Sequence, residues 1–150
     1  QGRTGALDAA VASDGWKLVT QQTAEWNAEK AQQIVQSVID SGESFNVIYA
    51  ENDDMAKGAV AALDKANIPH GVGKDVIVMG FDCNKWALEE LLAQNWNYDG
   101  QCNPFQASYI DEIIKTIQSG GTVAEKTIIM DEKGFDATTI TQEDVDSYGI

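Results

Sequence analysis

The clearest indication of this chain's fold lies in the stretch Asn46–Leu63, NVIYAENDDMAKGAVAAL. It begins with NVIYA, a run rich in β-formers, and continues into MAKGAVAAL, where small and apolar residues recur at helical spacing. Between the two lie Asn52, Asp53 and Asp54. Such side chains accept hydrogen bonds from the free N–H groups of a helix's first turn. The stretch therefore predicts a buried strand that leads directly into a helix.

The same alternation continues along the chain. Apolar, β-rich runs predict strands at Trp16–Thr20, Asn46–Ala50, Asp75–Phe81 and Lys126–Met130, and a weaker, polar one at Trp96–Cys102. Segments of helical period lie between them, at 28–42, 52–69, 85–93 and 104–120, with Gly42, Asn67 and Gly120 as stop signals. Strands that alternate with helices indicate βαβ units. We therefore expect an α/β fold, a three-layer αβα open parallel sheet.

Composition and charge restrict the function. The 150 residues are 43% hydrophobic and 23% charged, which suits one soluble domain. The formal net charge of -14 argues against a nucleic-acid or anionic-membrane surface, because few Lys and Arg are present to neutralise phosphates. We expect a neutral or cationic partner. No apolar run reaches the length of a membrane span.

Residues that carry chemistry are scarce. The chain has one histidine, His70, and two cysteines, Cys83 and Cys102, which are too few for a structural zinc site. Spacing leaves open whether the cysteines form a disulfide or stay thiols. No nucleophile–base arrangement, phosphate loop or calcium loop is recognisable. We expect no catalysis, no cofactor and no metal.

Aromatic and polar side chains follow the predicted strands, where an open α/β sheet binds its ligands. They are Trp26, Asn52, Asp53, Phe81, Asp82, Asn84, Trp86, Gln101 and Asn103. Aromatic rings stack on the apolar faces of sugars, while carboxylates and amides bind hydroxyl groups. The set suits a small neutral sugar. Alternatives remain for single residues: Asn52 or Asp53 caps the helix after Ala50, Asp82 caps the next helix, and Trp26 packs as a lid.

Four stretches of the chain together resemble one protein family. QQTAEWNAEKAQQIVQSVI, NVIYAENDDMAKGAVAAL, VIVMGFD and the CNP stretch before a helix resemble the periplasmic sugar-binding proteins of type I, the ribose- and galactose-type substrate-binding components of ABC importers. The resemblance covers about residues 5 to 130. It implies a two-lobe protein that clamps a sugar, of which residues 1–150 look like the C-terminal lobe, with the N-terminal lobe missing. It also implies an extracytoplasmic location and an ABC importer permease as partner.

The resemblance implies roles for single residues. Asn52 would bind sugar hydroxyls, Asp53 would cap the helix, and Asp82 after Phe81 would be a further hydroxyl acceptor. Trp26 takes the place of a stacking aromatic. A polar contact before the Pro-led helix falls on Cys102, with Gln101 and Asn103 beside it. The family's arginine is matched by Arg3 in a shifted frame, or by a residue before Gln1.

The helix at 104–120 carries an apolar face that the missing lobe would cover, made of Phe105, Tyr109, Ile110, Ile113, Ile114 and Ile117. In this chain we expect it to swing away and pack on another molecule, as a homo-dimer or a swapped helix, or to fold back on its own lobe. The alternative functions are the effector-binding lobe of a sugar-responsive repressor and, less favoured by the residues, a flavodoxin-like α/β enzyme.

Overall fold

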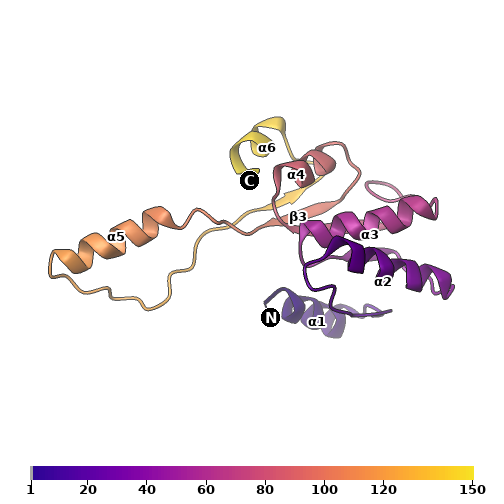
Figure 1. Ribbon diagram of the computed structural model, residues 1–150, viewed down its shortest axis with the longest axis horizontal. Coiled ribbons are helices and arrows are strands. Elements are labelled where there is room, and N and C mark those ends of the chain that lie inside the picture. Colours follow the sequence, from indigo (N-terminus) through magenta and orange to yellow (C-terminus); the bar gives the residue numbers. More distant parts are fainter. Residues whose placement is uncertain (1) are drawn as a thin grey trace.

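The computed structural model describes residues 2–150 as an α/β body from which one helical arm projects (Figure 1). Its sheet has the strand order β1-β2-β3-β4, with β1 at Val47–Tyr49, β2 at Ile77–Asp82, β3 at Tyr98–Gln101 and β4 at Gly134–Asp136. The pairs β1–β2 and β2–β3 are parallel, and β3–β4 is antiparallel. The helices are α1 (Gly2–Asp14), α2 (Ala28–Asp40), α3 (Asp53–Lys65), α4 (Lys85–Leu92), α5 (Ala107–Gln118) and α6 (Gln142–Tyr148). The expected α/β class is confirmed.

Two of the predicted strands are absent. Residues 16–20 and 126–130 pair with no other strand and are assigned no regular structure. Residues 16–20 line a cavity beside β1, and residues 126–130 lie on the return path from α5, where the side chain of Ile129 is 88% exposed. An apolar, β-prone run becomes a strand only where a neighbour supplies hydrogen bonds, and neither segment has one. The elements α1, β4 and α6 were not predicted.

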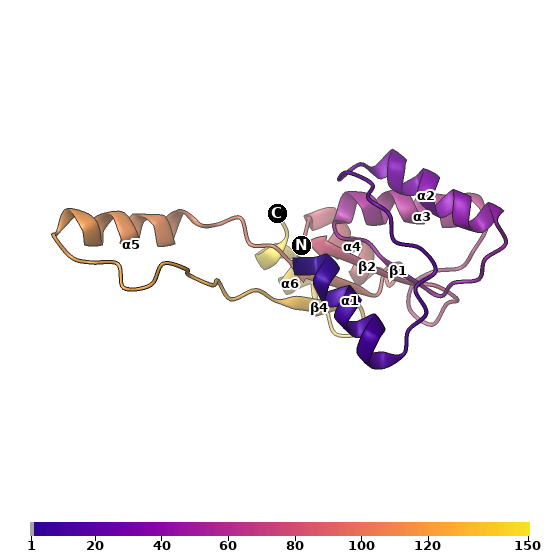
Figure 2. The same ribbon diagram turned by 90° about the horizontal axis from the view of Figure 1, so that it is seen from below.

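Helix α2 packs side by side with α3, and α3 packs directly on β1 and β2 (Figure 2). Gly58 of α3 makes this close approach possible, because a Cβ there would lie 2.0 Å from the Ala28 carbonyl oxygen. Helix α4 packs on β3, β4 and α6. The core between these elements includes Leu63, Val78, Leu88, Trp96 and Val145, all buried. This packing holds the carboxyl ends of β1, β2 and β3 in fixed positions.

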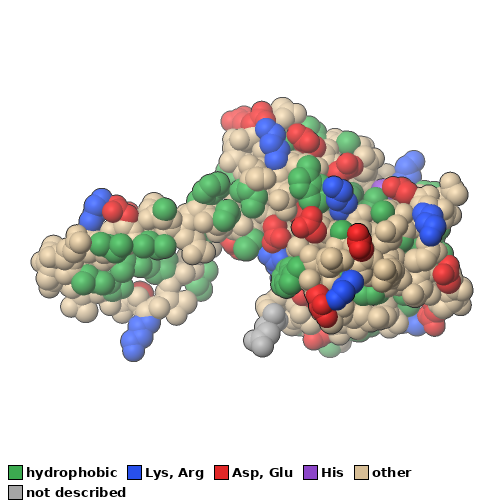
Figure 3. All heavy atoms as spheres, in the orientation of Figure 1, with side chains coloured by type: hydrophobic (Ala, Val, Ile, Leu, Met, Phe, Trp, Pro, Cys, Tyr) green, Lys and Arg blue, Asp and Glu red, His purple; other side chains and the backbone are tan. Residues whose placement is uncertain are grey.

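Helix α5 stands apart from the body at the end of two extended segments, residues 102–106 and 119–133, as both ribbon views show. None of its residues is buried. Figure 3 shows apolar side chains gathered along it. Ile110 and Ile117 of α5 are 51% and 59% exposed, and Phe105, just before the helix, is 67% exposed. The structure therefore has α5 swung away from the α/β body; that it packs on another molecule stays a prediction.

Two further observations concern the described part of the chain. Between residues 2 and 150, no helix combines the length and the apolar character that crossing a membrane requires. The two cysteines are free thiols, Cys83 buried and Cys102 exposed, so they do not form the disulfide that the sequence left open.

Candidate functional site

An ion pair joins Arg3 to Asp82 at the carboxyl ends of β1 and β2. The start of α1 brings Arg3 there, where its Nη2 lies 2.7 Å from Asp82 Oδ1 and its Nη1 donates to the Glu51 carbonyl oxygen. Tyr49 Oη donates to the Arg3 carbonyl oxygen at 3.0 Å. Burial would lower the pKa of the Arg3 guanidinium, but the hydrogen bond and charge of Asp82 outweigh it and raise that pKa. Arg3 is thus a permanent cation held beside a carboxylate.

Phe81 provides a flat apolar surface next to this ion pair. The Arg3 guanidinium carbon lies 4.9 Å from the centre of the Phe81 ring, within cation–π range. Tyr49 meets the same ring edge-on at 5.3 Å between centroids. Gly100 of β3 makes room for the ring, because a Cβ there would lie 2.6 Å from Phe81 Cδ1. Charge, hydrogen-bonding groups and an aromatic plane therefore meet within one small surface.

The cap of α3 is Asn52, not Asp53 as expected. Asn52 has an extended backbone, with φ of -159°, and its Oδ1 accepts from Met55 N at 2.9 Å. Asp53 is already the first helical residue, so its side chain points elsewhere and is fully buried. Within residues 2–150 the Asn52 Nδ2 makes no hydrogen bond, so this amide nitrogen remains available as a donor beside Glu51.

The turn after β2 has unusual backbone angles. Asp82 and Cys83 have φ of 117° and 63°, values that side chains other than glycine rarely adopt. Asn84, rather than Asp82, is the residue before α4, and it makes no side-chain cap. Instead its backbone N and its Nδ2 donate to Asp53 Oδ2 at 2.8 Å and 3.0 Å. Asp53 therefore fastens this turn to α3.

Beneath the turn, Asp53 faces a second buried carboxyl group, that of Asp99 on β3. Both residues are 0% exposed. Burial, together with the charge of Asp53, raises the pKa of Asp99 to about 9, and burial also raises the pKa of Asp53. Cys83 Sγ lies 3.7 Å from Asp99 Oδ1, and burial raises the pKa of this thiol. Sequence reasoning missed Asp99; the available signal was an acidic residue at an inward position of a strand.

Trp26 and Asn103 lie apart from this cluster. Trp26 is 62% exposed, has a positive φ of 59°, and lines the cavity beside β1. Asn103 belongs to the arm: its N–H donates to Glu132 Oε1 at 2.8 Å and its Oδ1 accepts from Phe105 N. In residues 2–150 no hydrogen bond or ion pair joins either residue to Arg3 or Asp82. Of the predicted ligand residues, the structure therefore groups Arg3, Phe81 and Asp82, with Asn52 following Glu51.

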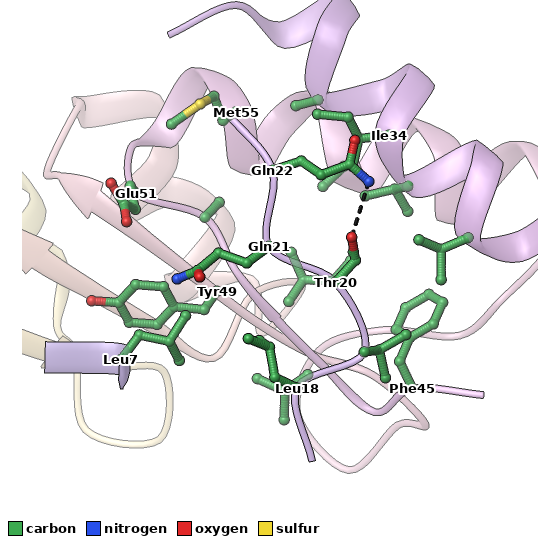
Figure 4. Close-up of a pocket in the computed structure, with 18 of the residues that line it drawn as sticks. Leu7, Leu18, Thr20, Gln21, Gln22, Ile34, Phe45, Tyr49, Glu51 and Met55 are labelled. Atoms are coloured by element: carbon green, nitrogen blue, oxygen red, sulfur yellow. Dashed lines mark hydrogen bonds between the residues drawn. The ribbon is translucent and has the colours of Figure 1, made fainter. Parts of the chain in front are cut away.

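The cavity beside β1 has a volume of about 910 Å³. Figure 4 shows Leu18 and Phe45 on one side of it and Ile34 of α2 on another, with Gln22 Nε2 donating to Thr20 Oγ1 at 2.9 Å. Most of its lining is apolar, and it adjoins the ion pair only through Thr4, Tyr49 and Glu51. Over residues 2–150, no group of three or more His, Cys, Asp or Glu side chains is arranged to hold a metal ion.

The packing under the site leaves no room for a side chain at Gly80 of β2. A Cβ at this position would lie 2.7 Å from Asp53 Oδ1 and 3.0 Å from Trp96 Cζ3, both on buried residues. We expect Gly80→Ala to lower the free energy of unfolding by about 1–3 kcal/mol, the usual effect of overpacking. Urea denaturation measures it. The matched control is Gly5→Ala in α1, where the Cβ meets nothing within 4 Å. Equal stability of the two variants would contradict the tight packing described here.

Residues 1–127 match the family model described as periplasmic binding protein domain. The fructose import binding protein FruE of Bifidobacterium longum is 31% identical over 125 residues, 82% of this chain and 37% of that protein. The D-apiose import binding protein of Actinobacillus succinogenes is 29% identical over 143 residues, 87% of this chain and 44% of that protein. The chain thus spans less than half the length of these relatives.

Solved structures of sugar-binding proteins also resemble this chain over about half of their length. An ABC transporter periplasmic solute binding protein from Actinobacillus succinogenes with bound D-allose has a TM-score of 0.78 and 26% identity, covering 96% of this chain and 48% of that one. A galactofuranose binding protein has a TM-score of 0.82 at 21% identity, covering 97% and 49%. At that identity the second likeness concerns the fold alone.

Proposed function

Since this chain belongs to the periplasmic binding protein domain family, we propose that it binds a neutral monosaccharide as one lobe of a sugar import binding protein. The observation that carries the proposal is the cluster of Arg3, Phe81 and Asp82 at the strand ends, with Asn52 beside it. The relatives named above support the ligand class, because their names specify fructose and D-apiose.

Each residue of the cluster has a role that its chemistry allows. Asp82 accepts hydrogen bonds from two sugar hydroxyls, and Arg3 and the Asn52 amide donate to sugar oxygens. Phe81 packs against an apolar face of the sugar ring. The side chains of Arg3 and Asp82 are 23% and 26% exposed, so a ligand reaches them while their ion pair stays partly shielded from water. A cluster of this kind binds and orients a ligand and leaves it chemically unchanged.

The sugar is held against a second lobe, in our proposal, and the present chain is the C-terminal one. Its coverage of less than half of each named relative supports its being a single lobe. That it is the C-terminal one rests on the resemblance of its motifs to that lobe. The position of α5 supports it as well, because an apolar helix face exposed on an arm has a natural partner in another lobe. The closed protein would act outside the cytoplasm and deliver its sugar to an ABC importer permease.

The 150-residue chain alone should bind sugar weakly or not at all. It carries only one side of the clamp, so the contacts of the opposite side are lost while the entropy of immobilising the ligand is still paid. Isothermal titration of the isolated chain with neutral monosaccharides measures this affinity. Micromolar binding by the chain alone would contradict the two-lobe clamp.

The proposed function is tested by a thermal-shift screen of the full-length gene product against neutral pyranoses and furanoses. A bound sugar stabilises the folded state, by about 2.7 kcal/mol at a hundred times its Kd, and so raises the melting temperature. We expect at least one monosaccharide to do so and to be recovered unchanged. A folded protein that responds to none of them, or that converts the sugar, would refute the proposal.

A further inference from the structure

Two carboxyl groups under the site are packed together without a visible partner for their facing oxygens. Asp53 Oδ1 and Asp99 Oδ2 are buried and accept no hydrogen bond from any other described group. Both lie around the same point above Gly80: from a Cβ built there, Asp53 Oδ1 is 2.7 Å away and Asp99 Oδ2 is 3.5 Å away. Two bare carboxylates in such a place would repel each other and remain unsolvated.

One proton between them removes this conflict. We propose that Asp53 and Asp99 share a single proton and that the pair positions Asp82 for ligand binding by holding the turn through Asn84. The inference rests on the proposed function for the role of Asp82, while the shared proton rests on the buried geometry alone. In this arrangement each facing oxygen has a hydrogen-bond partner.

The surroundings decide which residue carries the proton. Asp53 Oδ2 already accepts from Asn84 N and Asn84 Nδ2, and two such bonds stabilise a carboxylate. Asp99 accepts from the backbone of Cys83. Its only other donor within residues 2–150 is the Cys83 thiol, which lies at a long distance of 3.7 Å from Asp99 Oδ1. Asp99 is therefore the protonated member and donates from Oδ2 to Asp53 Oδ1, and Asp53 is the anion.

The pair reaches Asp82 through the polypeptide backbone. Asp53 holds both Asn84 donors, and Asn84 directly follows the two residues with positive φ, Asp82 and Cys83. Such a strained turn persists only where its surroundings fix it. Here one end of the turn is fixed by the ladder between Asp82 and Gln101, and the other end by Asp53. The fixed turn directs the Asp82 carboxylate toward Arg3, where the sugar would bind.

Protonation of the pair makes the stability of the folded chain depend on pH. The titratable groups that act on it are Asp82 and Cys83 from the turn and Arg3 from α1. Because the pKa of Asp99 is raised to about 9, the folded chain keeps a proton that the unfolded chain, with a pKa near 3.9, has lost. The resulting stability is complete below the unfolded pKa and is lost as pH rises toward the folded one.

The first measurement is urea unfolding of the 150-residue chain between pH 6 and pH 8, where the Cys83 thiol of the unfolded chain, with a pKa near 8.5, is still largely protonated. Release of one proton on unfolding raises the unfolding constant of the wild type by about tenfold per pH unit. Asp99→Asn keeps a donor toward Asp53 without a titrating proton, so this dependence should disappear while the fold remains. Asp53→Asn, whose amide accepts from Asn84 and donates to Asp99, should remove it as well and serves if Asp99→Asn does not fold.

The second measurement is the NMR titration of the same chain, read at the Asp99 and Asp82 carboxyl carbons and the Asn84 amide. In the wild type we expect the Asp99 carboxyl to titrate above pH 7 and the signals of Asn84 and Asp82 to move with the same midpoint. In Asp99→Asn and Asp53→Asn this movement of the Asn84 and Asp82 signals should be absent. A wild-type pH dependence equal to that of both variants overturns the shared proton. An alkaline titration of Asp99 that leaves Asn84 and Asp82 unmoved overturns the positioning role. Neither readout needs a sugar, so a failed sugar screen with these pH effects intact counts against the proposed function alone.

Discussion

Asp82→Asn in the full-length gene product lowers affinity for its sugar by about ten- to a hundredfold, the range expected when a hydrogen bond to a charged acceptor is lost. The substitution removes one acceptor oxygen and the charge, and it leaves Arg3 without the carboxylate charge that now lies 2.7 Å away. Asn tolerates positive φ better than most residues, so the turn at φ of 117° should survive. Isothermal titration gives the ratio of dissociation constants.

The matched control for this variant is Asp54→Asn. Asp54 is exposed in the first turn of α3 and forms no ion pair within the described residues, so the same chemical change there should alter sugar affinity less than about twofold. If Asp82→Asn bound the sugar as tightly as the control, Asp82 would have no contact with the ligand, and the cluster around Arg3 would not be its site.

The double variant Ile110→Asn, Ile114→Asn should destabilise the full-length protein strongly and the 150-residue chain hardly at all. In the chain these side chains are 51% and 46% exposed on α5, so little apolar burial is lost. Packed against a second lobe they would be buried, and removing one large apolar side chain from a core costs about 2–5 kcal/mol. Urea denaturation of both forms gives the difference in free energy of unfolding.

Glu112→Asn provides the control on the opposite side of the same helix, where the side chain is exposed. It should leave both forms nearly unchanged. If the double variant lowered the stability of the two forms equally, α5 would pack within its own lobe in solution. If it lowered neither, the apolar face of α5 would have no partner in the full-length protein.

The parts of the fold that follow from local pattern could be predicted. The alternation around Asn46–Leu63 and Asp75–Phe81 gave β1, α3 and β2, because buried parallel strands and their covering helices have distinct periods. The runs at 16–20 and 126–130 have the same local character and yet form no strand. Whether such a run pairs depends on a neighbour distant in the chain, which no single window of sequence contains.

The candidate site shows the same division. Asp82 and Phe81 could be proposed from their place after a strand, and Arg3 was proposed from the family resemblance; the structure brings the three together. Asp53 was predicted as the cap of α3 and Asn52 is the cap, because both residue types cap helices well and the choice depends on backbone angles. A role for Asp99 could not be predicted, because it depends on the contact with Asp53 of α3, which is distant in the sequence.

A crystal structure of the full-length gene product with the sugar found in the screen would show whether Arg3, Phe81 and Asp82 hold the ligand. We expect the sugar between two lobes, with hydroxyl oxygens about 2.6–3.2 Å from the Asp82 carboxylate and from the Asn52 amide nitrogen, and a ring face against Phe81. A sugar bound elsewhere, for example in the cavity between α2 and β1, with the surface around Arg3 and Asp82 empty, would contradict this expectation.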